Sequence, residues 1–491
     1  MESLKVDGPG RSGLAQRPLT QRKPSTPMMP AFMTSAPGKV IVYGEHAVVY
    51  GKAAMAAAIS LRSYLLVTAL TKSQRTITLR FPDIGMEHSW KIDHLPWSAF
   101  SHPSKKKYYY DLVDKLDPEL VEVMQPHLSV VSPKASPADK KIHQNAASAF
   151  LYLLLSLGSK SFSGCIYTIR STIPIGAGLG SSASISVCLS SAILLQLRTL
   201  SGPHPDQPPE EAELQIERIN RWAFVGEMCI HGNPSGVDNT VATCGKAVVF
   251  KRGDYTSAPT VTPVRNFPEL PLLLVNTRQS RSTATEVAKV ASLRKTHSSI
   301  IEPILEAIDK ITESAYHLVS SSAFDSKKSG SVQKLGDLMK INHGLLAALG
   351  VSHPKLERIR ELVESLDLGW TKLTGAGGGG SAIALLNSNA TPSSLQGLQR
   401  QLDNEGFEKY QTTLGGDGVG VLWPAVLRSG SEDEGGEEID QENFLNAKGI
   451  EGVEMLVGVG LGASEKREGW KFWSNVGPHV DDEGRQEYTS G

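Results

Sequence analysis

Residues 174–186, which read PIGAGLGSSASIS, decide how the rest of this 491-residue chain is interpreted. Three glycines spaced two apart are followed by a run of small residues. Residues 164–173 before this stretch are rich in β-branched and aromatic side chains, as strands are, and residues 181–197 are apolar and long enough for a helix. The sequence therefore predicts a strand, a glycine loop and a helix in that order.

This loop has the features of a phosphate-binding loop. Glycines let the backbone approach an anion closely, and the free N–H groups at the start of a helix favour negative charge. Ser181 and Ser182 add hydroxyl groups at the same point. The alternative is a plain helix N-terminus with glycines for tight packing, which explains one or two glycines but not the whole run. We interpret the loop as a phosphate site.

Composition excludes several classes of protein. The length predicts two domains plus tails, and a net charge of −1 gives no basic field for nucleic acid. The most apolar window, residues 150–157, is too short to span a bilayer, so we expect no membrane insertion. No cysteines form a C-x-x-C pair, which favours reduced thiols in a cytoplasmic protein over a zinc site: Cys165, Cys188, Cys229 and Cys244.

The two ends of the chain differ from its middle. Residues 1–31 contain five prolines and are expected to form a disordered extension. Residues 431–442 are an acidic run, and residues 443–491 carry only short apolar patches. We therefore expect residues 426–491 to form an acidic tail that is disordered or loosely docked.

Several polar residues near predicted element ends have two possible interpretations. Lys39 follows a small turn at residues 35–38 and begins a strand, and Glu45 and His46 lie at that strand's end. A surface lysine and a polar turn are the simpler explanations. These residues alone leave both alternatives open.

The same ambiguity applies further along the chain. Glu227 lies near the end of a predicted helix over residues 210–230, where it is either solvated or a metal ligand. Asp238 lies in a turn-rich loop, where it forms either an Asx-turn or helix cap, or part of a site. Arg281 and Thr283 precede a long predicted helix ending near residue 323, where they either cap the helix or contact an anion.

Familiar nucleotide-binding signatures do not explain the loop. The P-loop pattern G-x-x-x-x-G-K-[ST] is missing from the sequence, and so are the protein-kinase landmarks H-R-D and D-F-G. Gly178, Gly180 and Ala183 match the dinucleotide pattern G-x-G-x-x-A. That fold needs a second strand directly after the helix, whereas here the proline-rich residues 202–209 follow. The context excludes a dehydrogenase.

Three separate segments resemble one known family. Residues 35–46 (SAPGK and GEH), 174–183 and 372–380 (KLTGAGGGG) resemble the three ordered motifs of the galactokinase, homoserine kinase, mevalonate kinase and phosphomevalonate kinase superfamily. Within it, residues 38–52 and 231–239 are most similar to the mevalonate kinases. The resemblance covers roughly residues 32–425 and leaves both tails outside.

The resemblance implies a two-domain α+β fold. It comprises an N-terminal domain like ribosomal protein S5 over residues 32–268, with a mixed sheet, and a ferredoxin-like C-terminal domain over residues 269–425. The active site is expected in the cleft between them. The implied reaction is ATP-dependent phosphorylation of the C5 hydroxyl of (R)-mevalonate to 5-phosphomevalonate, for isoprenoid and sterol synthesis. The family also implies a homodimer and feedback inhibition by prenyl diphosphates at the ATP site.

The resemblance also implies roles for individual residues. Asp238 would accept the proton of the attacking hydroxyl, with Lys39 beside it, and Ser182 and Glu227 would hold Mg²⁺ through hard oxygens. Asp83 stands where relatives often carry Asn near the adenine. The ATP contacts would come from Ser171, Gly176, Ala177, Gly178, Leu179, Gly180, Ser181 and Ser182. The mevalonate pocket would be lined by Glu45, His46, Arg281 and Thr283, the arginine answering the substrate carboxylate.

Two alternative functions have to be distinguished from mevalonate phosphorylation. Another kinase of the superfamily would act on a sugar or an amino-acid alcohol. A ligand sensor would keep the pocket without turnover, although the joint presence of Lys39, Ser182, Glu227 and Asp238 argues against it.

Overall fold

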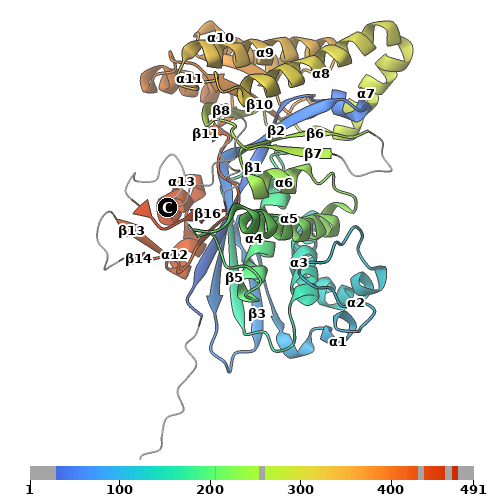
Figure 1. Ribbon diagram of the computed structural model, residues 1–491, viewed down its shortest axis with the longest axis vertical. Coiled ribbons are helices and arrows are strands. Elements are labelled where there is room, and N and C mark those ends of the chain that lie inside the picture. The colour runs from blue at the N-terminus through green and yellow to red at the C-terminus, as the bar shows by residue number, and fades with distance from the viewer. Residues whose placement is uncertain (1–28, 205, 254–259, 430–435, 459–466, 474–491) are drawn as a thin grey trace, which may run out of the picture.

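The computed structural model describes residues 29–204, 206–253, 260–429, 436–458 and 467–473. Figure 1 shows two α+β units stacked along the long axis of the molecule. Thirteen of the described strands belong to one sheet that runs through both units. A three-stranded sheet lies beside the N-terminal unit, in the order β14 (Glu437–Glu438), β13 (Val426–Ser429) and β15 (Arg467–Glu468).

Strand β2 (Ala53–Ala69) is the centre of this large sheet. It pairs with β1 (Phe32–Tyr43) along one edge and with β5 (Cys165–Ser171) and β6 (Ala247–Lys251) along the other. Between β5 and β6, Ile59 of β2 pairs with Leu414 of the C-terminal unit. One strand thus connects the sheets of the two units.

The N-terminal unit has the mixed sheet that the resemblance predicted. Strand β3 (Thr76–Phe81) pairs antiparallel with β4 (Met86–Lys91) and parallel with β5. One face of this sheet is covered by α3 (Pro137–Leu157), α4 (Ser181–Gln196) and α5 (Pro209–His231). The remaining elements of the unit are η1 (Ala47–Tyr50), η2 (Pro82–Ile84), η3 (Ile92–His94), α1 (Trp97–Phe100), α2 (Pro118–Ser129), α6 (Val237–Cys244) and β7 (Thr260–Val264).

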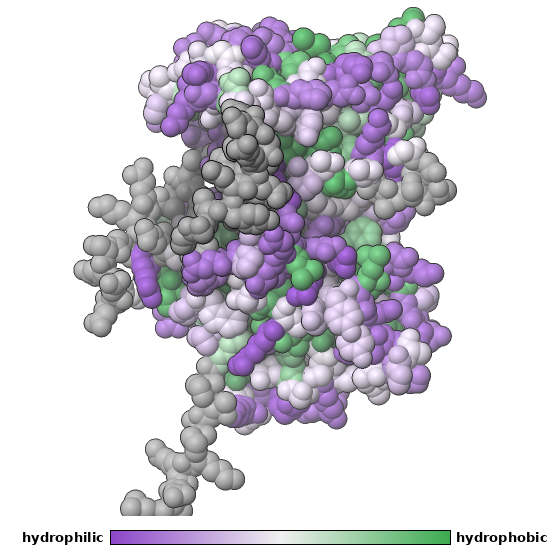
Figure 2. Space-filling view, in the orientation of Figure 1, coloured by the Kyte–Doolittle hydropathy of each residue, from purple (hydrophilic) through white to green (hydrophobic). Residues whose placement is uncertain are grey.

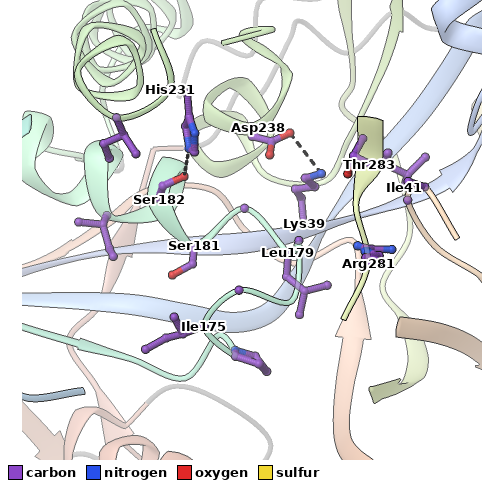
Figure 3. Close-up of a pocket in the computed structure, with 18 of the residues that line it drawn as sticks. Lys39, Ile41, Ile175, Leu179, Ser181, Ser182, His231, Asp238, Arg281 and Thr283 are labelled. Carbon is purple, nitrogen blue, oxygen red and sulfur yellow. Dashed lines mark hydrogen bonds and ion pairs between the residues drawn. The ribbon is translucent and has the colours of Figure 1, made fainter. Parts of the chain in front are cut away.

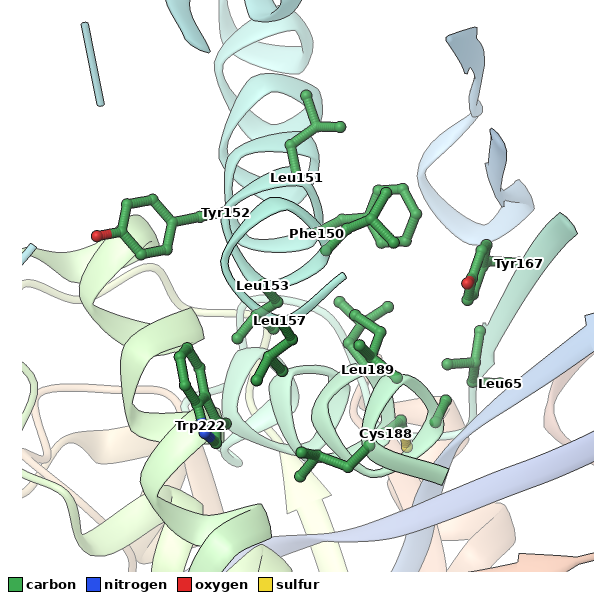
Figure 4. Close-up of a cluster of buried hydrophobic side chains, with 14 of the residues drawn as sticks. Leu65, Phe150, Leu151, Tyr152, Leu153, Leu157, Tyr167, Cys188, Leu189 and Trp222 are labelled. Atoms are coloured by element: carbon green, nitrogen blue, oxygen red, sulfur yellow. The ribbon is translucent and has the colours of Figure 1, made fainter. Parts of the chain in front are cut away.

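The main core of the N-terminal unit lies between this sheet and α3. Leu65 of β2 and Tyr167 of β5 face Phe150 of α3 in one buried cluster (Figure 4), to which Val67 of β2 also belongs. The Phe150 and Tyr167 rings are 4.9 Å apart, edge to face. Such packing of aromatic and aliphatic side chains is the main stabilising contribution of the unit.

The C-terminal unit has the strand order of a ferredoxin-like fold. Its four antiparallel strands are arranged β11-β8-β10-β9, so that the first strand in sequence lies inside the sheet. The bounds are β8 (Leu270–Asn276), β9 (Gly369–Leu373), β10 (Ser381–Leu386) and β11 (Glu408–Leu414). The helices lie above this sheet in Figure 1, and hydrophilic residues cover much of their outer surface in Figure 2. They are α7 (Thr283–Thr296), α8 (Ser298–Ser320), α9 (Ser329–Ala348), α10 (Pro354–Ser365) and α11 (Pro392–Asn404).

Three local predictions were wrong. The turn predicted at residues 35–38 is part of the continuous strand β1, which absorbs the irregularity as a bulge between Pro37 and Lys39. The long helix predicted to end near residue 323 is two helices, α7 and α8, which break at His297. Asp238 lies in the first turn of α6 and not in a loop.

The predicted disordered or loosely docked tail is also wrong for the described residues beyond Pro424. Strand β16 (Lys471–Phe472) pairs with β12 (Gly420–Leu422) at the edge of the large sheet. The other elements of this segment are β13 (Val426–Ser429), β14 (Glu437–Glu438), α12 (Gln441–Asn446), α13 (Gly449–Val457) and β15 (Arg467–Glu468).

This C-terminal segment covers the second face of the N-terminal sheet. Along β2, Leu65 faces the helices, whereas its neighbours Tyr64 and Leu66 face the opposite side, where they pack with fully buried Phe444 and Val457. The acidic composition of this segment led to the wrong prediction, because its few apolar residues are the ones that cover an otherwise exposed sheet face. The extension over residues 1–28 and the tail residues 430–435, 459–466 and 474–491 lie outside the described residues.

Within the part of the chain that the structure describes, no helix is both long and apolar enough to cross a membrane.

Candidate active site

A cavity of about 650 Å³ lies where the two units meet. The N-terminal unit contributes β1, the glycine loop and the start of α4, and the C-terminal unit contributes Arg281, Thr283, Gly375 and Ala376. Figure 3 shows side chains from these elements turned toward one space. The cavity thus occupies the cleft that the family resemblance predicted.

The glycine loop has the predicted strand, loop and helix order. It connects β5 to α4, which begins at Ser181. Gly176, Gly178 and Gly180 have φ angles of 74°, 76° and 75°, in the left-handed region that favours glycine. The loop and the first turn of α4 line the cavity. The residues in this stretch therefore provide a helix N-terminus suited to an anion.

Lys39 and Asp238 form an ion pair in the cavity wall. The Lys39 Nζ atom lies 3.3 Å from Asp238 Oδ1 (Figure 3). The backbone N–H of Lys39 donates to the carbonyl of Leu179 at 2.8 Å. A Cβ atom on Gly180 would lie 3.0 Å from Lys39 Cγ, so the loop needs glycine here to approach the lysine. These contacts thus fix the position of the phosphate loop relative to the Lys39–Asp238 pair.

Ser182, Glu227 and His231 form a second polar group. The Ser182 hydroxyl donates to Glu227 Oε2 at 3.3 Å and lies 3.1 Å from His231 Nε2. Burial, followed by the charge of Asp238, raises the pKa of Glu227 to about 7. Sequence reasoning missed His231, although its position one turn after Glu227 on α5 places both on one helix face.

The Ser182 and Glu227 oxygens fit a magnesium ion. Glu227 is 4% exposed, and among the described residues its Oε1 atom is buried without a hydrogen-bond partner. The described part of the chain contains no cluster of three or more His, Cys, Asp or Glu groups that could hold a metal. A sparse oxygen donor set suits Mg²⁺, which usually keeps waters and binds substrate phosphates as well.

Arg281 joins the glycine loop to a second one, residues 374–380, which connects β9 to β10. Its Nη1 atom donates to Thr374 O at 3.1 Å and its Nη2 atom to Ala177 O at 3.4 Å. A Cβ atom on Gly178 would lie 2.6 Å from Nη2, and one on Gly380 would lie 2.6 Å from Cζ. Burial lowers the pKa of Arg281 from its ordinary value. Glycines in both loops therefore make room for this guanidinium.

Glu45 and His46 line the cavity but are engaged with the C-terminal unit. The Glu45 carboxylate forms a buried ion pair with Lys372 and accepts from Asn342 Nδ2 at 3.1 Å. His46 Nε2 lies 2.8 Å from Ala376 O, and burial lowers the His46 pKa. Sequence reasoning missed the partners Lys372 and Asn342, because only the fold brings residues about 300 positions apart together.

Two residues predicted to contact ATP do not line the cavity. Ser171 lies on β5, where its backbone N–H donates to Asp83 Oδ2 at 2.7 Å. Ala177 is buried and contributes its carbonyl to Arg281. The remaining predicted loop residues, and Lys39, Glu45, His46, Asp238, Arg281 and Thr283, line the cavity together. Glu227 lies behind Ser182.

One end of the cavity has an apolar wall that sequence reasoning missed. It includes Phe81 and Ile84, which flank Asp83, together with Ile142, Ala146 and Ile175. These residues come from β3, η2, α3 and the glycine loop, so no single motif marks them. A flat apolar group fits against this wall. The wall and the Lys39–Asp238 pair lie on opposite sides of the phosphate loop.

Comparison with known families agrees with this arrangement. Residues 144–246 match the family model for the GHMP kinases N terminal domain, and residues 322–408 match that for GHMP kinases C terminal. The fold and the cavity thus define a kinase of the GHMP class.

Comparison with individual relatives shows which family of GHMP kinases the chain belongs to. The chain is 68% identical over 452 residues to the mevalonate kinase of Aspergillus fumigatus, covering 92% of this chain and 84% of that relative. It is 65% identical over 454 residues to that of Gibberella zeae, covering 92% and 89%. The chain belongs to the mevalonate kinase family. The solved Methanococcus jannaschii mevalonate kinase has the same fold, with a TM-score of 0.54 at 24% identity over 78% of this chain and 98% of that one.

Proposed function

We propose that this enzyme transfers the γ-phosphoryl group of ATP to the C5 hydroxyl of (R)-mevalonate, giving 5-phosphomevalonate for isoprenoid and sterol synthesis. The observation that carries the proposal is the position of the Lys39–Asp238 pair. It lies between the glycine loop on one side and Arg281 and Thr283 on the other. A phosphate donor and a small acidic alcohol would meet there.

The nucleotide occupies the loop and the apolar wall. The start of α4 and residues 176–182 hold the phosphates, because the loop supplies N–H groups and the positive end of the helix. Phe81 and Ile84 enclose the adenine from one side. The triphosphate then points toward Asp238.

Asp238 accepts the proton of the attacking hydroxyl. Its carboxylate is a hydrogen-bond acceptor next to the cationic Lys39, which also offsets the charge that develops during transfer. Phosphoryl transfer requires little covalent chemistry from the protein, so positioning and charge neutralisation account for most of the catalysis.

Ser182 and Glu227 would hold Mg²⁺, which would supply positive charge that neutralises the ATP phosphates. The Ser182 hydroxyl already lies within hydrogen-bond distance of Glu227, which brings the two oxygens to the same place.

Mevalonate occupies the side of the cavity formed by both units. Arg281 binds the substrate carboxylate, since a guanidinium matches a carboxylate in two parallel hydrogen bonds. Thr283, at the start of α7, and His46 contact the rest of the molecule. The ion pair between Glu45 and Lys372 holds the backbone at this point, and so holds the neighbouring His46 in place.

ADP release tests the proposal. Purified protein with Mg·ATP is given mevalonate, galactose or homoserine in turn, and ADP is measured. We expect ADP release with mevalonate and no ADP release with galactose or homoserine. Release with another alcohol would identify a different kinase of the class, and tight ATP binding without any release would identify a sensor.

The family resemblance supports three further expectations. A cytoplasmic location agrees with four cysteines that are free in the structure. A homodimer is expected from the family and is tested by sedimentation. Prenyl diphosphates are expected to compete with ATP, because the apolar wall beside the phosphate loop fits a prenyl chain.

A further inference from the structure

Arg170 connects the C-terminal segment to the apolar end of the cavity. It lies on β5 and is 5% exposed. Its Nε atom donates to Asp83 Oδ1 at 2.8 Å. Its Nη1 atom donates to the carbonyls of Phe444 and Leu445 at 2.9 and 3.0 Å, and Nη2 donates to that of Ala447 at 2.7 Å. One guanidinium thus bonds a carboxylate and three carbonyls at the end of α12.

Asp83 transmits this contact to the cavity wall. It is the middle residue of η2, and its second oxygen accepts from the backbone N–H of Ser171 at 2.7 Å. The residues on either side of Pro82 and Asp83 are Phe81 and Ile84, whose side chains line the cavity. The Asp83 side chain therefore fixes the turn that carries both wall residues.

We propose that Arg170 is a positioning residue for the nucleotide. Seated on the last carbonyls of α12, it holds η2 so that Phe81 and Ile84 form the adenine wall, and the C-terminal segment thereby sets the affinity for ATP. The inference rests on the proposed function in placing the adenine at this end of the cavity.

The chemistry of the contact requires both the arginine and the C-terminal segment. Arginine has donors in a fixed planar fork, whereas lysine has three donors on a single nitrogen. Lysine at this position can pair with Asp83 or with the carbonyls, but its one nitrogen does not span the acceptors. Without the carbonyls of α12, the guanidinium would be free to leave Asp83. A second link, between Arg80 and Glu442 at 3.6 Å, joins β3 to the same helix.

The test uses Arg170→Lys in the full-length chain. Losing charge-assisted hydrogen bonds should raise the KM for ATP by about tenfold or more. The KM for mevalonate and kcat should stay within about twofold, because Lys39, Asp238 and Arg281 are untouched. Asp83→Ala removes both oxygens that accept from Arg170 and from the backbone N–H of Ser171, so it should shift the KM for ATP in the same direction. It carries the test if Arg170→Lys does not fold.

Arg62→Lys is the matched control. Arg62 is also buried on the large sheet, and it donates to Ser35 Oγ at 2.8 Å and to the carbonyls of Asp417 and Gly418 at 2.7 and 2.5 Å. It does not line the cavity. Its substitution should lower the melting temperature and leave the KM for ATP unchanged.

Two outcomes would overturn the inference. One is a folded Arg170→Lys protein with the parental KM for ATP, and the other is an equal rise in that KM for Arg62→Lys. Calorimetric titration with ADP separates this question from the proposed function. A protein that fails to phosphorylate mevalonate can still show, or fail to show, weakened ADP binding in the Arg170 and Asp83 variants.

Discussion

The ammonium group of Lys39, on the bulge of β1, lies 3.3 Å from the carboxylate of Asp238, in the first turn of α6. The two residues are almost 200 positions apart, and the cavity is built around their contact. A bulge re-aims one side chain within a strand, which is how β1 directs Lys39 toward the helix.

Asp238→Asn and Lys39→Met should each lower kcat by about 100-fold or more, since each removes a charged group from the point of transfer. Asp337→Asn, on the exposed surface of α9, is the control and should match the parent. Rates are measured by ADP release, and circular dichroism checks folding. Near-normal turnover in Asp238→Asn would exclude the assigned role.

Ser182→Ala and Glu227→Gln should raise the free Mg²⁺ concentration needed for half-maximal rate, with the larger effect for Glu227→Gln because it removes the charge. The rate is measured against free Mg²⁺ at saturating ATP. Glu217→Gln, also on α5 but exposed and paired with Arg221, provides the comparison. An unchanged Mg²⁺ dependence in both site variants would contradict the assignment.

Lys372→Met should destabilise the protein by about 3–5 kcal/mol, because it leaves the Glu45 carboxylate buried without its partner. Urea unfolding measures this change. The double variant Glu45→Gln, Lys372→Met removes both charges and should recover much of the loss. Equal stability of the single and double variants would show that the pair is not coupled.

Gly380→Ala should raise the KM for mevalonate. The new Cβ would come within 2.6 Å of Arg281 Cζ at a φ angle of 69°, so the arginine is displaced. Gly397→Ala, inside α11 where a Cβ meets open space, should instead stabilise the protein by up to about 1 kcal/mol. Mevalonate kinetics and thermal melting separate the two effects.

Local signals predicted the glycine loop, α4 and α5 well, whereas α2, α6 and α11 were not predicted. The φ angles and helix start around Ser181 follow from nearby residues, and the motif order pointed to the cleft. Lys372 and Asn342 were missed because their roles depend on contacts across the fold. The docking of Phe444 was missed for the same reason, since its partners on β2 lie nearly 400 residues earlier. His231 could have been found locally, from its position one turn after Glu227 on α5.

Strand β2 has a mechanical consequence for substrate entry. A hinge needs a few residues whose backbone angles can change, and the residues of β2 that cross between the units are held by pairing on both edges. A hinge motion that opens the cleft between the two units is therefore disfavoured. We therefore expect solution-scattering profiles with and without ATP and mevalonate to nearly superimpose.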